Sequence, residues 1–517
     1  MQVLDNIQST WFFIPEFILT GFFIAIFLVD LPKRWADRPK ISAGLAAAGL
    51  IAYIVATVAF HSFPVIAFHG MIIVDNFTDF FRIFCAATAL LTVYMSLKSD
   101  EIREVRAEYW ALLLGITIGM SALAASNNLL MIYLALELVS ILSYIMVSYI
   151  PGSKRSAEAG LKYVLYGATA SGIMIYGLSL IFGVTGTLDA LQIKQYLLAN
   201  PAERLPLFVG LLMAFAGFGY KVSAVPFHMW APDVYEGAPT PVTAFLSVGP
   251  KAAGFAILIR FIYSALTVHQ GGEFIPLKYI DISNLISVFA IATMTLGNLA
   301  AIQQTNIKRF LAYSSIAHAG YMLMAAAALN EEALRAILFY LISYFIMNLG
   351  AFAVAIAVIN EFKTEDMDAF KGLGRRPGKG AWIALFMTLF LFSLTGLPPT
   401  VGFIGKFYLF TAVIDAKLYA LAVIGVLNSV VSLYYYARIV KYMYFEDPAD
   451  DRLVLDNVRC SLRAGGVLLM ELMGKEVVSR TLKIRDQAEE DGVVLLTEQR
   501  ARDDWTWVDN RLVVLAG

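Results

Sequence analysis

The sequence has little charge and almost no cysteine for its length. Only 15% of its 517 residues are charged, against about 25% in a soluble domain, and 59% are hydrophobic. The two cysteines, Cys85 and Cys460, lie far apart and fit no metal or redox spacing. There is no CxxC pair, Gly-rich dinucleotide loop or haem signature, so we expect no electron-carrier chemistry on this chain. The net charge of −1 provides no basic surface for nucleic acid. The composition indicates an all-α polytopic membrane protein.

Long apolar runs recur along the chain. Runs of about 17–25 residues are long enough to cross a bilayer as helices. The first has no basic segment before it and no small-residue cleavage site after it, so we interpret it as a retained span and not as a signal peptide. We predict thirteen spans, at roughly 11–30, 41–60, 73–97, 109–125, 128–150, 158–184, 205–228, 240–267, 281–303, 308–328, 333–359, 380–413 and 417–443.

Lysine and arginine residues predict how these spans are oriented. The loops after odd-numbered spans carry eighteen of them, and the loops after even-numbered spans carry five. Basic loops remain on the cytoplasmic side of a membrane. The sequence therefore predicts an N-terminus outside, and thirteen spans would leave the C-terminal tail in the cytoplasm.

Two of the predicted spans are interrupted by proline and carry a lysine. Span seven leads into residues 217–254, a stretch with five prolines, and span twelve contains SLTGLPPTVGFIGKF at 393–407. The two spans are five apart, an odd number, so they cross the membrane in opposite senses. Broken helices in corresponding, inverted positions are typical of a transporter site between two repeats. We predict two inverted five-helix repeats (spans 4–8 and 9–13) with broken helices 7 and 12. The predicted domains are, in order, a three-helix segment at 1–105, the first repeat at 106–267, the second repeat at 268–445 and a polar, α/β-like tail at 446–517.

Four of the ionisable residues inside predicted spans are the main candidates for function. A charge at the centre of a membrane helix costs roughly 2.5–3.5 kcal/mol on insertion scales, so such residues are candidates for function. The alternatives are a structural ion pair for Glu137 and a lysine that extends to the interface for Lys221. A buried lysine beside a carboxylate can change its charge when the pair separates, which suits the movement of protons. The candidate relay is Glu137, Lys221, Lys251 and Lys406.

Three further candidates have stronger structural alternatives. Lys162 begins span six, where Glu158 could simply anchor it as an i,i+4 partner. His228 could relay protons, or it could end a helix at the interface. His318 could belong to a water-linked relay or could be a packed histidine; hydroxyl groups precede it at Tyr313, Ser314 and Ser315.

Three of these stretches also carry a family resemblance. They are FGYKVSAVPFHMWAPDVYEGAPTPVTAFLSVGPKAAG (218–254), NLAAIQQTNIKRFLAYSSIAHAGYML (298–323) and SLTGLPPTVGFIGKFYLF (393–410). In this order they closely resemble the antiporter-like subunit N, or subunit 2, family of the proton-pumping NADH:quinone oxidoreductase, respiratory complex I. The resemblance covers residues 1 to about 446.

The resemblance implies a function and a set of partners. It implies a multi-pass subunit of the cell inner membrane, in a translocase that pumps protons when quinone is reduced on other subunits. NADH, FMN, iron–sulfur clusters and quinone would be bound by those partner subunits, and this chain would carry no cofactor, no metal and no redox chemistry. By motif, protons would pass Lys221, Lys251 and Lys406 in turn, Glu137 would modulate Lys221, and Lys162 would be the family's span-six lysine.

The tail departs from that family, which ordinarily has a fourteenth span. Residues 446–517 are polar, and their longest apolar run, GGVLLMELMG, is too short to cross a membrane. SLRAGGVLLMELMGKE and WTWVDNRLVVLAG resemble the last strands of an S-adenosylmethionine-dependent methyltransferase, but the Gly-rich cofactor loop is absent. We expect no methyl transfer. A fusion, a frameshift or an assembly error would each explain the tail.

Two other functions remain open from the residues alone. A secondary sodium/proton antiporter subunit would have the same two helical halves, and a non-functional scaffold would fit the foreign tail. The buried lysines argue against the scaffold, and the SAVPFHMWAPDVYEGAP wording favours the complex I family by resemblance.

Overall fold

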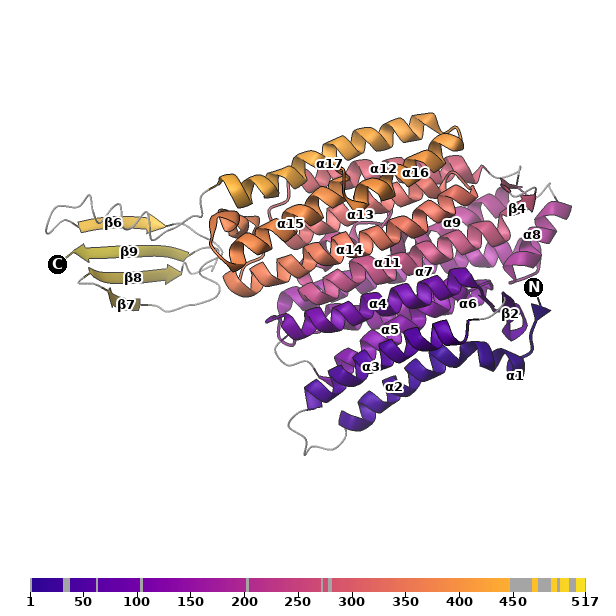
Figure 1. The fold of residues 1–517 in the computed structure, drawn as a ribbon, viewed down its shortest axis with the longest axis horizontal. Helices are drawn as coiled ribbons and strands as arrows, with labels where there is room; N and C mark the ends of the chain where they lie inside the picture. The colour runs from indigo at the N-terminus through magenta and orange to yellow at the C-terminus, as the bar shows by residue number, and fades with distance from the viewer. Residues whose placement is uncertain are drawn as a thin grey trace. The chain divides into compact units, whose positions relative to one another are not determined.

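The protein folds into two separate units. The computed structural model describes residues 2–30, 38–61, 64–102, 106–200, 204–270, 273–277 and 281–446, and in the tail 467–472, 485–490, 493–501 and 508–516. Met1–Glu446 form one unit and Asp447–Gly517 the other. The first unit is a bundle of long helices that run side by side (Figure 1).

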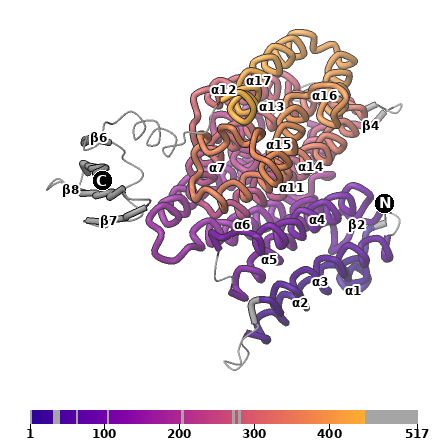
Figure 2. The backbone as a smooth tube through the Cα atoms, turned by 60° about the vertical axis from the view of Figure 1, so that its left-hand side comes forward, coloured from indigo at the N-terminus to yellow at the C-terminus, as the bar shows by residue number. Residues whose placement is uncertain are grey.

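Helices make up nearly all of the first unit. Figure 2, turned by 60° from the view of Figure 1, shows α2 and α3 at one side of the bundle and α17 at the other. The α-helices are α1 Asn6–Ser9, α2 Ile14–Asp30, α3 Arg38–Ala59, α4 Asn76–Lys98, α5 Ala107–Ala125, α6 Leu129–Val147, α7 Lys154–Thr185, α8 Ala190–Ala199, α9 Arg204–Val222, α10 Trp230–Gly237, α11 Thr240–Ala265, α12 Ile282–Ile302, α13 Ile307–Ala326, α14 Glu331–Phe362, α15 Lys379–Thr395, α16 Val401–Asp415 and α17 Tyr419–Phe445. Four short 3₁₀ helices are η1 Thr10–Phe13, η2 Phe68–Gly70, η3 Met367–Phe370 and η4 Leu373–Arg375.

The predicted all-α polytopic membrane fold is confirmed. Each of the thirteen predicted spans overlaps a helix of the bundle. Among the described residues, 11 helices are long and apolar enough to cross a membrane, or up to 12 if a bent pair counts as one span. Helices α13 and α16 are not among the 11. Helix α13 carries polar residues that are buried against other helices, and α16 is the 15-residue second half of a broken span.

Helix α11 lies at the centre of the bundle. All residues of its most apolar window are buried, and it contacts α4, α5, α9 and α14. Pro250 lies inside this helix, directly before Lys251. A proline has no backbone N–H, so it removes one hydrogen bond from the helix at this point. The lysine therefore lies at a weakened turn in the middle of the bundle.

The chain is interrupted at both places where the sequence predicts broken helices. Helix α9 ends at Val222 and α10 begins at Trp230, and the backbone N–H of Val225 donates to the Thr293 hydroxyl at 3.0 Å. Helix α15 ends at Thr395 and α16 begins at Val401. Such breaks are tolerated at membrane depth only where the freed backbone groups find partners inside the protein.

Glycines allow α7 and α9 to pack closely. A Cβ atom at Gly177 of α7 would lie 2.6 Å from backbone atoms of Gly210 and Ala214 on α9. Small residues at facing positions are the usual means by which membrane helices approach one another.

Three small β-sheets complete the fold. Strands β1 (Gln2–Val3), β2 (Val65–Ala67) and β3 (Ile72–Val74) form a sheet in which β1–β2 is parallel and β2–β3 antiparallel. Strands β4 (Thr267–Gln270) and β5 (Glu273–Pro276) form an antiparallel hairpin. In the tail, the described residues form an antiparallel sheet in the order β6-β9-β8-β7, from β6 (Val467–Leu472), β7 (Arg485–Glu490), β8 (Val493–Ala501) and β9 (Val508–Ala516). The rest of the predicted α/β-like tail lies outside the described residues.

Candidate functional site

Four lysine side chains are buried among the described residues, and one of them, Lys308, forms an ion pair with Glu365; the other three form none. Lys221 of α9, Lys251 of α11 and Lys406 of α16 have relative exposures of 2%, 2% and 4%. An ammonium group away from water requires hydrogen bonds or opposite charge to stay ionised. The partners of each lysine therefore indicate how its charge is stabilised.

Lys221 lies next to the carboxylate that the sequence singles out on α6. Its Nζ donates to Oγ of Ser140 on α6 at 3.1 Å. Its charge also interacts with that of Glu137, which lies three residues before Ser140 on α6. Oε1 of Glu137 is buried and has no hydrogen-bond partner among the described residues. The structure thus brings Glu137 and Lys221 together in one site, with the serine between their helices.

Lys251 joins α11 to α13. Its Nζ donates to the carbonyl oxygen of Ser315 at 3.1 Å and to the Ser315 hydroxyl at 2.5 Å. Both partners are neutral, so dipoles and not an opposite charge stabilise an ammonium here. The Ser315 hydroxyl, which the sequence analysis groups with His318, therefore lies at Lys251.

His318 lies one turn further along α13, in a network of hydroxyl groups. Its Nδ1 contacts the hydroxyl of Tyr340 at 2.6 Å and its Nε2 that of Tyr436 at 3.1 Å. The Tyr436 hydroxyl also lies 2.5 Å from Oγ of Ser314. The ring is 1% exposed and connects α13 with α14 and α17. Sequence reasoning did not find Tyr340 and Tyr436, because nothing in an apolar run shows which tyrosine faces inward.

Lys406 is held by neutral groups at the second helix break. Its Nζ donates to the carbonyl of Thr395 at 2.7 Å and to Oγ of Ser429 at 3.0 Å, and lies 4.6 Å from the centre of the Tyr321 ring. Thr395 is the last residue of α15, and the free carbonyls at a helix C-terminus attract a cation. An aromatic face adds a further attraction. The break supplies one of these groups, and α17 and α13 supply the other two.

Lys162 lies apart from the buried lysines, beside a charged cavity. Its side chain is 37% exposed and forms ion pairs with Glu158 and Asp233, both at 2.8 Å. The expected i,i+4 anchor is therefore present, together with a partner from the first broken span. The cavity has a volume of about 240 Å³ and is lined by Arg155, Glu158, Ala159, Lys162, Asp233, Glu236, Gly237 and Arg309.

Ion pairs continue from this cavity into the second half of the bundle. Glu365 pairs with Lys308 at 2.8 Å and with Arg155 at 2.5 Å. Burial opposes ionisation of Glu365, but the charges of Lys308 and Arg155 outweigh it and hold the pKa of this carboxyl below its usual value. The network links the start of α7 with the start of α13.

His228 lies between α9 and α10 and is 6% exposed. Its Nδ1 is buried and has no hydrogen-bond partner among the described residues. The structure therefore gives His228 no polar link to the buried lysines through this atom.

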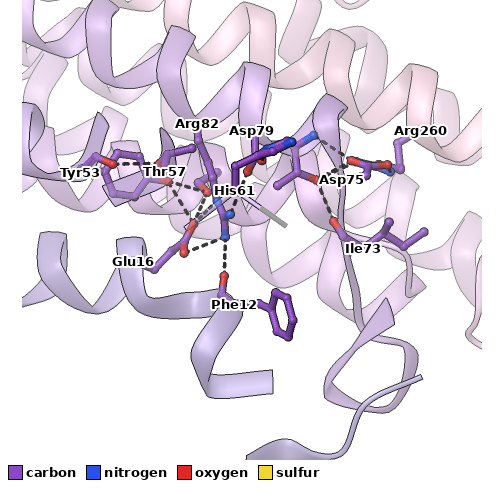
Figure 3. Close-up of polar contacts among 12 residues, drawn as sticks. Phe12, Glu16, Tyr53, Thr57, His61, Ile73, Asp75, Asp79, Arg82 and Arg260 are labelled. Carbon is purple, nitrogen blue, oxygen red and sulfur yellow. Dashed lines mark hydrogen bonds and ion pairs between the residues drawn. The ribbon is translucent and has the colours of Figure 1, made fainter. Parts of the chain in front are cut away.

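A second buried ionic cluster lies among the N-terminal helices and was not predicted. Arg82 of α4 donates to both carboxylate oxygens of Glu16 on α2, at 2.8 and 2.9 Å (Figure 3). Glu16 also accepts from Ser121 of α5 at 2.6 Å and from Tyr53 of α3 at 3.0 Å. Every charge in this cluster is paired, so its geometry indicates attachment of the N-terminal helices to the bundle. An arginine inside an apolar run was the signal in the sequence.

The same figure shows how the N-terminal region is joined to the central helix. Arg260 of α11 donates to the two carboxylate oxygens of Asp75 at 2.6 and 2.8 Å, and to the Thr78 hydroxyl at 2.8 Å (Figure 3). This bidentate pair is the stronger kind of ion pair. It fixes the half of α11 that follows Pro250.

Comparison with known proteins identifies the family. The family model described as NADH:quinone oxidoreductase/Mrp antiporter, TM matches residues 126–432. NADH-quinone oxidoreductase subunit N 2 of Sorangium cellulosum is 45% identical over 493 residues, which cover 90% of this chain and 96% of that protein. The chain belongs to the subunit N family of NADH-quinone oxidoreductases. A second subunit N 2, from Chloroherpeton thalassium, is 46% identical and covers 85% of this chain and 86% of that protein.

Solved structures agree with membership of the subunit N family. A chain of respiratory complex I from Thermus thermophilus is 30% identical, with a TM-score of 0.67, and covers 86% of this chain and 94% of that one. A chain of the Mrp complex from Dietzia has a TM-score of 0.71 at 21% identity, over 84% of this chain and 80% of that one. At that identity the likeness to the Mrp complex concerns the fold alone. In this subunit N chain, Lys221 and Lys406 are buried at the two helix breaks, and such costly positions need a functional explanation.

Proposed function

We propose that this chain is a proton-translocating membrane subunit of an NADH-quinone oxidoreductase. Protons pass through its buried lysines when quinone is reduced on other subunits of the complex. One observation carries this proposal: three lysines lie buried in one bundle, at two helix breaks and one helix proline. Such positions are expensive in a membrane and are retained for ion pathways.

The relay has three stages. Lys221 receives a proton, and Glu137 stabilises the charge while the two groups are close. Lys251 takes the proton at the proline of α11, and the Ser315 hydroxyl and the network around His318 lead towards α16. Lys406 releases it on the other side. The hydrogen bonds of Lys251 and Lys406 to neutral groups support these assignments.

Lys162 and His228 have subsidiary roles in this proposal. Lys162 lies at the charged cavity and takes part in proton uptake, for which its partial exposure is suitable. His228 lies in the break that follows Lys221 and responds to movement of α10. Neither residue is required for the passage from Lys221 to Lys406.

The chain acts within a larger assembly in the cell inner membrane. Its partners are the other membrane subunits of the complex, and NADH, FMN, iron–sulfur clusters and quinone are bound by partner subunits. The N-terminus lies outside and the tail in the cytoplasm, an orientation supported by the lysine and arginine bias of the loops.

A sodium/proton antiporter subunit is the second candidate, because the fold resembles a chain of an Mrp complex. The test uses inverted membrane vesicles that lack this chain or contain it again. The proposal is supported if proton uptake driven by NADH and quinone is absent without the chain and returns when the chain is restored. Sodium-driven proton movement without electron transfer would instead support the antiporter. Assembly of the complex is followed on a native gel.

A further inference from the structure

Gly167 of α7 leaves a notch that two tyrosine hydroxyls fill. A Cβ atom at Gly167 would overlap the hydroxyl oxygen of Tyr144 on α6 and would lie 2.8 Å from that of Tyr220 on α9. Real Cβ atoms essentially never come closer than 3.0 Å to another heavy atom. Both hydroxyls therefore occupy the volume that any side chain at Gly167 would take. They are also close enough to each other to share a proton directly or through one water molecule.

The Tyr144 hydroxyl is buried without a hydrogen-bond partner among the described residues. A buried polar group without a partner is destabilising, so such a group in a folded protein calls for an explanation. The Tyr220 hydroxyl, by contrast, donates to the carbonyl of Tyr163 at 3.0 Å and keeps its lone pairs free to accept. The unpaired hydroxyl is thus next to an available acceptor.

On its inner side the notch leads to the first buried lysine. Tyr144, Ser140 and Glu137 are spaced by four and three residues on α6, so they share one face of that helix. The Ser140 hydroxyl accepts the hydrogen bond of Lys221, and Lys221 directly follows Tyr220 on α9. The two tyrosines therefore border the site of Glu137 and Lys221 from two helices.

On its outer side the notch leads to the charged cavity. Tyr163, whose carbonyl holds the Tyr220 hydroxyl, is adjacent in sequence to Lys162, which lines the cavity. The Trp230 ring stacks on that of Tyr163 with centroids 4.5 Å apart, and its indole N–H donates to the Tyr220 carbonyl at 3.0 Å. The rings of Tyr144, Tyr163, Tyr220 and Trp230 thus form one packed group, which contains the residue after Lys162 and the residue before Lys221.

We propose that Tyr144 and Tyr220, fitted into the notch at Gly167, form the gate for protons between the cavity at Lys162 and the site of Lys221. The gate deepens the proposed relay and rests on it. The Tyr220 hydroxyl first turns from the Tyr163 carbonyl towards Tyr144; a proton arriving from the cavity then binds the Tyr220 oxygen, and the original Tyr220 proton passes to the Tyr144 oxygen. Tyr144 then releases its proton towards Lys221 or Glu137. Each O–H bond broken is replaced by one formed, and rotation of both hydroxyls restores the starting state.

The test compares two glycines of α7 in the assembled complex. Gly167→Ala should lower the proton translocation coupled to NADH oxidation on the order of tenfold, since it displaces both hydroxyls. Gly172→Ala is the matched control: it lies on the same helix, and its added Cβ would meet nothing within 4 Å. Equal translocation by the two variants would overturn the gate.

Two isosteric variants keep the proposal testable if Gly167→Ala does not fold. Tyr144→Phe removes only the unpaired oxygen and Tyr220→Phe the second one, and native gels check assembly. Each should lower translocation per electron several-fold. Parent-like translocation by both would refute the gate. Lys221→Ala distinguishes failure of the gate from failure of the relay. If Lys221→Ala stops translocation and the Phe variants do not, the gate alone is wrong. If Lys221→Ala leaves translocation unchanged, the relay is wrong.

Discussion

Lys221 and Lys406 lie at the two helix breaks but are stabilised in different ways. Lys221 precedes its break, and the charge of Glu137 on another helix acts on it. Lys406 follows its break and is held by a carbonyl, a hydroxyl and an aromatic ring. The first lysine can change its charge when a carboxylate moves, whereas the second is stabilised by fixed dipoles. The difference suggests that control acts at the first break and release at the second.

The largest effect is expected from Lys406→Ala. Among the described residues no second lysine donates to the carbonyl of Thr395, so proton translocation should fall at least about tenfold, or roughly 1.4 kcal/mol in the barrier. Translocation is measured per electron in inverted vesicles. Lys417→Ala, an exposed lysine two residues after the end of the same helix, is the control and should behave like the parent. Equal behaviour of the two variants would remove Lys406 from the pathway.

A smaller effect is expected from Glu137→Gln. The amide keeps the shape of the side chain but removes the charge that acts on Lys221, so translocation should fall several-fold and not disappear. The exposed Glu332→Gln on α14 serves as control. If both variants translocate protons like the parent, the charge of Glu137 does not control Lys221.

The second break can be probed through its glycine. Gly396 has a φ of +88°, and a Cβ atom there would lie 2.9 Å from Cδ of Lys406. Gly186, which ends α7, has a φ of +68° with nothing within 4 Å of an added Cβ. Both glycines end a helix in the left-handed region, so their alanine variants carry similar backbone strain, and the additional loss in Gly396→Ala, about 1–3 kcal/mol, measures the clash with the lysine. Thermal unfolding in detergent gives both values, and equal losses would show that Lys406 is not confined by the break.

The smallest effect is expected for Glu365, the carboxylate that pairs with the buried Lys308. The pKa of Glu365 is lowered against burial by Lys308 and Arg155, so its contribution to stability is present above the unfolded pKa, near 4.3, and is lost as the pH falls through the folded value. The parent should therefore lose more thermal stability than Glu365→Gln when the pH is lowered from 7 towards 4. Parallel curves for the two proteins would contradict this.

Much of the fold was predictable because membrane helices follow from apolar length and charge. Each predicted span overlaps a helix, and proline and glycine marked both breaks. The sequence also predicts spans ten and twelve, although α13 and α16 are not among the 11 helices that are long and apolar enough on their own. Polar side chains of α13 are buried against protein, and the break divides the twelfth span into halves too short to count alone.

The candidate site was predictable only in part. A lysine in an apolar run is visible in the sequence, so Lys221, Lys251 and Lys406 could be found. Their partners could not, since the inward face of a helix depends on its rotation in the bundle. Tyr340, Tyr436 and the notch at Gly167 are of this kind. The paired arginines Arg82 and Arg260 were visible but were not considered.

The most direct test of the proton relay is translocation per electron by the complex with Lys221→Ala. Inverted vesicles are supplied with NADH and quinone, proton uptake is followed with a pH-sensitive dye, NADH oxidation is measured in parallel, and native gels establish assembly. The relay predicts an assembled complex whose proton uptake per electron is lost or strongly reduced. Parent-like uptake in the assembled variant would make Lys221 a packing residue and contradict the relay.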